Sequence, residues 1–260
     1  MPPDNACPNC GSEVLARYCA NCGQSQSRAD ASLFQILSEA FGELTDLDSR
    51  IWLTVRTLLF RPGRITRDYC QYRRARYLPP FRIYILTNVL LYFVINWFDG
   101  GVRVGLGIDV PALEDGGFRF FDPNEADIVP QVGFIMLPFL ALGLTLLYLN
   151  QRKSYSDHFV AALHIKTLVA ILIAIAAIIN GLWTTLEYLF GLDLRNIGGR
   201  ITLLLMPIII VYLIASLQTI YGGKLLLNII RVPVLLVAYF YTAAGIVYLV
   251  GFLLIHLRIG

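Results

Sequence analysis

The stretch Phe81–Phe98, FRIYILTNVLLYFVINWF, decides the fold class of this chain. It holds 18 residues and a single charge, on Arg82 at its start. An α-helix of that length rises about 27 Å, close to the ~30 Å hydrocarbon core of a bilayer. The residues before the stretch suit water, whereas most residues after it suit lipid. The stretch therefore predicts the first of several transmembrane helices.

The composition of the whole chain agrees with this prediction. Of its 260 residues, 57% are hydrophobic and 15% are charged, whereas a soluble domain has about 25% charged residues. The mean hydropathy is +0.63. The net charge of +3 is too small to indicate a nucleic-acid partner. These values place the chain among integral membrane proteins.

Four further apolar stretches predict four more spans, which makes an all-α polytopic membrane domain over residues 81–260. The predicted spans are 81–98, 130–149, 163–183, 201–221 and 232–257. No signal-peptide pattern opens the chain, so we expect the N-terminus in the cytoplasm and the C-terminus in the periplasm. This topology puts 16 of the 21 lysines and arginines on the cytoplasmic side of an inner membrane, as the positive-inside rule requires. Residues 184–200 are a candidate interfacial helix.

Residues 1–30 contain two C-x-x-C-G pairs, Cys7 with Cys10 and Cys19 with Cys22. Two thiolates on one tight turn can converge on an ion, and two such turns supply the four soft ligands of a tetrahedral site. The reducing cytoplasm favours a metal over disulfides. We predict a structural zinc ribbon with one Zn²⁺ ion, and a redox dithiol pair or an iron site is the alternative. Since the ribbon lacks a basic patch, a docked protein is a better expected partner than nucleic acid.

Residues 31–80 predict a cytosolic collar between the ribbon and the first span. Two amphipathic helices, near 33–44 and 50–60, precede an Arg61-Pro62-Gly63 turn and a basic run. Positive charges beside a span hold that side in the cytoplasm and contact anionic lipid headgroups. A specific site for a phosphate-bearing lipid or substrate is the alternative. The arginines of the run are Arg64, Arg67, Arg73, Arg74 and Arg76.

Polar residues near or within the predicted spans are the remaining site candidates. The asparagines within spans are Asn88, Asn96 and Asn180. We expect them to hydrogen-bond between helices, with a transport route as the alternative. A second group could form a polar mouth at the start of the third span or could serve as interface anchors and caps. Its members are Asp157, His158, His164 and Lys166.

Taken together, these motifs resemble a bacterial membrane-protein family known only as a domain of unknown function, number 3667. The motifs that carry the resemblance are Tyr18-Cys19-Ala20-Asn21-Cys22-Gly23-Gln24, Arg61-Pro62-Gly63, the run from Tyr69 to Pro80, and the set Tyr155, Asp157, His158 and His164. Two positions depart from the family pattern, because Tyr72 stands in place of a glycine and Asp157 in place of a glutamate. The resemblance implies an inner-membrane protein headed by a zinc ribbon, and it implies no activity.

The sequence assigns no reaction. It contains no G-x-S-x-G, P-loop, H-E-x-x-H or Rossmann glycine pattern. We expect a non-enzymatic membrane adaptor or regulatory component, with lipids and a docked protein as partners. A transporter or channel subunit is one alternative, and a membrane enzyme acting on a lipid headgroup is another.

Overall fold

The fold is all-α, as the sequence predicts. The structure is a computed structural model that describes residues 6–16, 18–24, 50–97, 128–151, 153–190 and 197–257. Within these ranges the regular secondary structure is helical, apart from isolated bridges such as that between Ala6 and Glu13. The predicted helix near 33–44 and residues 98–127, between the first two predicted spans, lie outside the described residues.

In the described ranges, two short helices of the collar precede five long ones. The short helices are α2 (Arg50–Phe60) and α3 (Arg64–Cys70). The long helices are α4 (Pro80–Trp97), α5 (Ile128–Leu147), α6 (Tyr155–Phe190), α7 (Ile197–Tyr221) and α8 (Leu225–Leu257). Each long helix overlaps one predicted span, although α6, α7 and α8 begin four to eight residues earlier than predicted. Residues 184–190, part of the candidate interfacial helix, continue α6 instead.

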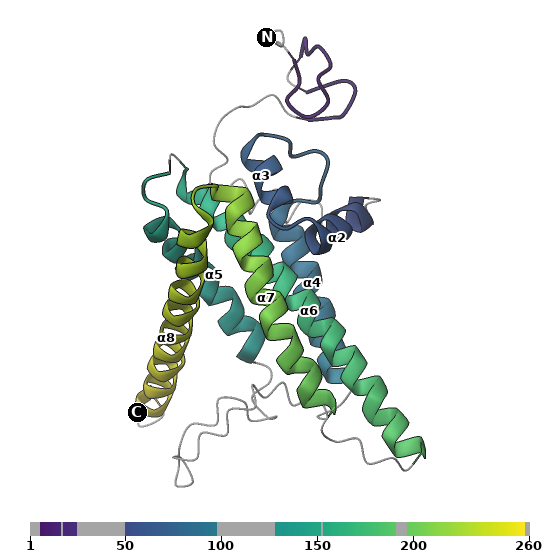
Figure 1. The fold of residues 1–260 in the computed structure, drawn as a ribbon, viewed down its shortest axis with the longest axis vertical. Coiled ribbons are helices and arrows are strands. Elements are labelled where there is room, and N and C mark those ends of the chain that lie inside the picture. Colours follow the sequence, from purple (N-terminus) through teal and green to yellow (C-terminus); the bar gives the residue numbers. More distant parts are fainter. Residues whose placement is uncertain are drawn as a thin grey trace.

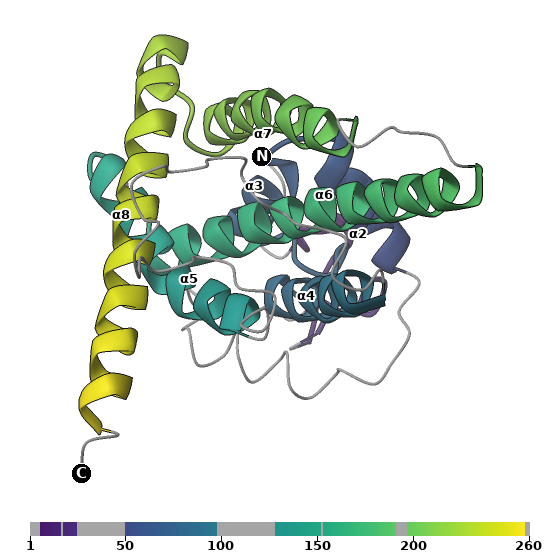
Figure 2. The ribbon, with the colours of Figure 1, turned by 90° about the horizontal axis from the view of Figure 1, so that it is seen from below.

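Helix α6 is the axis of the bundle. Figure 2 shows it between α7 on one side and α4 and α5 on the other, while α8 lies beyond α5. The four residues from Val160 to Leu163 have no exposed surface. Ala177, further along the same helix, has no exposed surface either. Alanines on the central helix let its neighbours approach closely. The core therefore forms around α6 and contains residues from all five long helices.

Two of the described helices are long and apolar enough to cross a membrane. These segments are Tyr155–Trp183 in α6 and Leu225–Ile246 in α8. Their surroundings differ, because 56% of the apolar window in α6 is buried inside the protein and only 17% of that in α8 is. Shorter apolar segments lie in α4, α5 and α7. Five spans stay a prediction, with these two helices as its support.

The Arg61-Pro62-Gly63 turn fastens the collar to the bundle. Gly63 adopts φ 72°, in the left-handed region that side chains disfavour, and it caps the start of α3. A Cβ atom on Gly63 would lie 2.6 Å from the backbone oxygen of Ser216 in α7 and 2.9 Å from Cβ of Thr219. On the same side, the Tyr212 hydroxyl of α7 donates a hydrogen bond to the carbonyl of Leu58. Only glycine satisfies both the backbone angle and the contact with α7.

We therefore expect Gly63→Ala to lower the free energy of unfolding by about 2–5 kcal/mol, the sum of a left-handed alanine and an overpacked contact. Denaturant or thermal unfolding of the purified chain measures this loss. Gly222→Ala is the matched control, because Gly222 has φ +67° but open space around its Cβ position. It should cost only about 1–2 kcal/mol. Equal losses in the two variants would show that the contact with α7 is unimportant.

Candidate metal centre and its contacts with the collar

The four N-terminal cysteines come together as a candidate metal centre. Their Sγ atoms all lie within 4.8 Å of one another. The Cys7–Cys22 and Cys10–Cys19 Sγ atoms are each 3.6 Å apart. A tetrahedral ion with bonds of about 2.3 Å to sulfur places its ligands about 3.8 Å apart. The donor set therefore fits one tetrahedral metal ion, which confirms that these four residues can form a common site.

The backbone holds the two cysteine pairs in matching turns. Gly11 donates its N–H to the carbonyl of Cys7, and Gly23 donates to that of Cys19, at 2.8 Å in each case. Gly11 and Gly23 have φ 78° and 73°, so both turns need the left-handed conformation. Hydrogen bonds from the Ser12 hydroxyl and backbone N–H lower the pKa of the Cys10 thiol to about 6. Cys10 is therefore largely a thiolate at neutral pH, the form that binds metals, whereas burial raises the pKa of the Cys22 thiol to about 11, so a bound metal ion would displace the Cys22 proton.

Gln24, directly after the second turn, joins the metal centre to the collar. Its side chain is 6% exposed and lies against the loop between α3 and α4. The amide oxygen accepts hydrogen bonds from the backbone N–H groups of Arg74 at 3.1 Å and Ala75 at 3.2 Å. The amide nitrogen donates to the carbonyl of Tyr72. One side chain therefore satisfies three backbone groups of a loop about 50 residues further along the chain.

Tyr72 has a backbone conformation that the glycine expected from the family resemblance would adopt without strain. With φ 62°, it is the non-glycine residue of the described ranges that has a positive φ. Its carbonyl is the acceptor for Gln24, so the contact between ribbon and loop depends on this backbone conformation. The guanidinium of Arg74 lies 5.2 Å from the centre of the Tyr72 ring, a contact that glycine cannot make.

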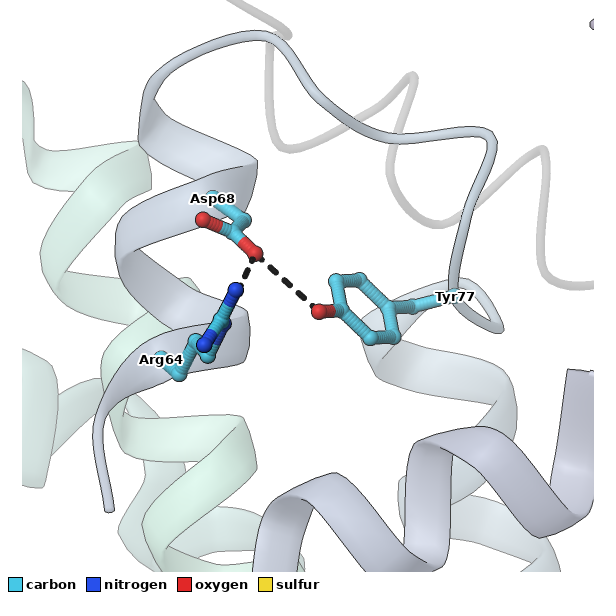
Figure 3. Close-up of polar contacts among 3 residues, drawn as sticks. All are labelled: Arg64, Asp68 and Tyr77. Atoms are coloured by element: carbon cyan, nitrogen blue, oxygen red, sulfur yellow. Dashed lines mark hydrogen bonds and ion pairs between the residues drawn. The ribbon is translucent and has the colours of Figure 1, made fainter. Parts of the chain in front are cut away.

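A buried carboxylate organises the start of the same loop. Asp68 is 5% exposed and accepts a hydrogen bond of 3.0 Å from the Tyr77 hydroxyl (Figure 3). Nε of Arg64 lies 3.8 Å from the same carboxylate oxygen. Burial and the hydrogen bond to Asp68 raise the pKa of Tyr77, which therefore stays a donor. Arg64 belongs to this structural group, so it is a weaker candidate for a lipid or phosphate contact than the exposed arginines.

The other arginines of the predicted basic run differ in their surroundings. Arg67, Arg73 and Arg76 are exposed. Arg76 lies 5.8 Å from the centre of the Tyr77 ring. Arg74 is half-buried, and its guanidinium lies 4.6 Å from the centre of the Tyr69 ring. The structure therefore spreads these side chains along the collar and does not gather all five into one pocket.

The four residues of the predicted polar mouth have separate partners. Asp157 accepts hydrogen bonds from the backbone and hydroxyl of Ser154, both at 3.1 Å, and so completes a capping box with Ser154 at the start of α6. The three basic members contact three different helices. The pairs are His158 Nδ1 with the Tyr221 hydroxyl of α7 at 2.7 Å, His164 Nδ1 with the Thr66 hydroxyl of α3 at 2.9 Å, and Lys166 Nζ with the Tyr239 hydroxyl of α8 at 2.7 Å.

The second ring nitrogen of His164, Nε2, takes no part in the contact with Thr66. This nitrogen is buried and has no hydrogen-bond partner among the described residues. The ring lines a hollow of about 10 Å³ that Thr66, Gly63 and Ser216 also line. This volume suits about a single water molecule, and such a water would satisfy the nitrogen. The contact between α3 and α6 therefore has a polar core.

The asparagines of the predicted spans do not meet in the described part of the chain. Nδ2 of Asn88 donates to the carbonyl of Tyr84 at 2.8 Å, four residues back in its own helix. Oδ1 of Asn180 is buried without a hydrogen-bond partner. The side chain of Asn96 lies outside the described residues.

Cys70, the fifth cysteine, ends α3 away from the metal centre. Burial, followed by the neighbouring Asp157 carboxylate, raises its pKa to about 12. Such a thiol carries almost no thiolate at neutral pH, so Cys70 is a poor nucleophile.

These features define a class: an all-helical protein with candidate membrane helices and a four-cysteine cluster joined to its collar. Residues 48–93 match the profile of the family described as "Protein of unknown function (DUF3667)". The match covers α2, α3 and most of α4, and over these residues it confirms the resemblance to that family. No curated protein and no solved structure matches the chain.

Sequence reasoning did not assign a role to Gln24, Asp68, Thr66 or Tyr221. Gln24 was visible only as the last residue of the cysteine motif, and Asp68 only as a lone acid within the basic run. Their partners lie 9 to 98 residues away, so no local spacing pattern identifies them.

Replacing Gln24 with alanine should free the loop between α3 and α4. Two N–H groups and one carbonyl lose their partner, and each part-buried hydrogen bond lost costs about 0.5–1.5 kcal/mol. We expect hydrogen exchange at the Arg74 and Ala75 amides to accelerate at least about tenfold. Gln71→Ala is the control, because Gln71 is exposed in the same loop. Unchanged exchange in Gln24→Ala would mean that the ribbon does not hold the loop.

Proposed function

We propose that this protein is a non-enzymatic adaptor or regulatory component of the bacterial inner membrane, built on five transmembrane helices and a cytosolic zinc ribbon. The observation that carries the proposal is the contact of Gln24 with the loop at Tyr72, Arg74 and Ala75. Through it, a metal-stabilised head is joined directly to the segment that enters the first predicted span. A head fixed in this way can transmit the binding of a partner to the membrane helices.

The proposed topology places the ribbon and collar in the cytoplasm and the C-terminus in the periplasm. It is supported by the two helices that are long and apolar enough to span a membrane and by the lysine and arginine excess on the ribbon side. The proposed parts are the ribbon over 1–30, the collar over 31–80 and the membrane domain over 81–260.

Zinc is the proposed ion. Four cysteine Sγ atoms within 4.8 Å of one another, two pairs of them 3.6 Å apart, suit its preference for tetrahedral sulfur ligation. With all four positions taken by cysteine, such an ion has no open coordination site and acts structurally. It would supply most of the folding free energy of a segment that has no apolar core of its own.

The wild-type protein purified in detergent should contain one zinc ion per chain, and the Cys19→Ser/Cys22→Ser variant should contain none. Elemental analysis measures both. Cys70→Ser serves as the control and should keep its zinc, because Cys70 lies outside the cluster. Iron in place of zinc, or a metal-free wild type with redox-active thiols, would contradict a structural zinc ribbon.

The adaptor role predicts a cytosolic protein bound to the ribbon. A photo-reactive amino acid at Leu15, which is 89% exposed on the ribbon, should cross-link that protein in cells. The adduct should disappear in the Cys19→Ser/Cys22→Ser background while the membrane domain accumulates normally. If no protein adduct forms in either background, the adaptor role is wrong.

The two alternative functions predict different effects of substitutions. A transporter or channel subunit should lose flux in Asn88→Leu at normal expression. A lipid-headgroup enzyme should lose turnover in His158→Ala and Arg74→Ala with its zinc intact. Neither alternative is favoured by a particular contact, because Asn88 bonds within its own helix and His158 bonds to Tyr221.

A further inference from the structure

Helix α2 turns its threonines inward and its largest apolar side chains outward. Thr54 and Thr57 are buried, whereas Trp52 is 76% exposed and Phe60 is 77% exposed. An amphipathic helix on a water-soluble surface has the opposite arrangement, with its aromatic residues in the core. The outward face therefore needs an apolar partner that the described chain does not provide.

Specific contacts of the inward face fix this orientation. The Thr54 hydroxyl accepts a hydrogen bond of 3.0 Å from the backbone N–H of Leu78. The Arg50 guanidinium donates to the carbonyl of Ala75 at 3.0 Å. Leu58 packs with Ile65 of α3 and with other buried residues of the collar and α6. Rotating α2 to hide its aromatic residues would break these contacts, so the helix is held with that face outward.

The outward face combines aromatic rings with positive charge. Trp52, Arg56 and Phe60 are spaced by four residues and so lie along one side of the helix. All three are exposed, and so is Arg61 directly after the helix. Tryptophan and phenylalanine favour the boundary between headgroups and acyl chains, and an arginine among them can reach lipid phosphates. Both features of this face match the surface of an anionic membrane.

The placement of α2 in the molecule suits the same partner. Figure 1 shows α2 running crosswise to the long helices, near the end of the bundle where α3 lies. With its 11 residues, α2 is too short to span a bilayer. A helix that lies across the ends of membrane-spanning helices runs parallel to the bilayer surface. Its outward face then meets lipid headgroups.

We propose that α2 is an interfacial helix that binds anionic phospholipids of the cytoplasmic leaflet, with Trp52 and Phe60 inserted at the acyl boundary and Arg56 and Arg61 on lipid phosphates. This inference rests on the membrane placement proposed above and adds a lipid-binding surface to it. The collar is then held on three sides: by the metal-stabilised head through Gln24, by α7 through Gly63, and by lipid through α2.

The fluorescence of Trp52 in reconstituted protein tests the proposal. The chain has three tryptophans, so Trp97→Phe/Trp183→Phe leaves Trp52 as the sole emitter in the full-length chain. The variant is reconstituted into phosphatidylcholine vesicles containing phosphatidylglycerol and lipids brominated either high or low on the acyl chains. We expect Trp52 to be quenched at least about twofold more by the shallow bromines than by the deep ones. It should also be shielded from aqueous iodide.

Two controls separate a failure of this inference from a failure of the proposed membrane placement. Trp97, 83% exposed at the end of α4, is left as the sole tryptophan in the first control. It must be quenched by brominated lipid if α4 enters the bilayer at all. In the second, Leu15→Trp in a tryptophan-free chain reports the aqueous ribbon and must be quenched by iodide. Bromine quenching of Trp97 but not of Trp52 would overturn only the role of α2.

Charge variants test the headgroup contact. Each arginine near an anionic surface contributes about 1 kcal/mol, or roughly fivefold in the preference of this fixed face for an anionic over a neutral lipid. Arg56→Gln should therefore reduce the shallow-bromine quenching of Trp52, as should vesicles of phosphatidylcholine alone. Lys224→Gln, which removes an exposed charge from the turn before α8, should leave it unchanged.

Three results would overturn the proposal. Strong iodide quenching of Trp52 would mean that the face is in water. Shielding from both iodide and brominated lipid would mean that a protein surface covers it, either another chain or a second copy of this one. Quenching by brominated lipid that is indifferent to Arg56→Gln and to phosphatidylglycerol would mean that the face contacts lipid without recognising anionic headgroups.

Discussion

The close approach of Gly63 to the backbone of α7 is the contact on which the collar depends. A hydrogen in place of a side chain lets the turn before α3 lie against the Ser216 carbonyl, where a Cβ would be only 2.6 Å away. That approach brings α3 to α6, so that Thr66 reaches His164 at 2.9 Å. It also brings the Leu58 carbonyl to Tyr212. Because the turn fixes α2 and α3 together, it also determines which face of α2 remains exposed.

Hydrogen bonds connect the collar to the metal centre through the loop between α3 and α4. The loop after α3 is held by the hydrogen bond between Tyr77 and Asp68. It is also held by the hydrogen bonds that its backbone makes with Gln24. These are polar contacts with defined geometry, whereas apolar packing alone would let a small head slide over the loop. The metal centre is thus part of a continuous structure with the helices. This continuity is the physical basis for proposing that the head communicates with the membrane domain.

Three ionisable residues of α6 hydrogen-bond to neighbouring helices and so stabilise the packing of the bundle. His158, His164 and Lys166 are close in sequence, yet each bonds to a hydroxyl on a different neighbouring helix. Since unpaired polar groups are costly in an apolar interior, three such bonds favour one arrangement of α3, α7 and α8 around α6. They specify how the bundle assembles, and the described contacts gather no common reaction centre around them.

Sequence alone determined the features that depend on local patterns. Two C-x-x-C-G pairs define the four ligands, since each pair forms its own turn, and long apolar runs define the helices of the bundle. The tertiary structure decided what depends on distant partners. The outward face of α2, the separation of the polar-mouth residues and the role of Gln24 depend on side chains up to 98 residues away. Helical periodicity shows that α2 has two faces, but only its contacts with Leu78 and Ala75 determine which face is buried.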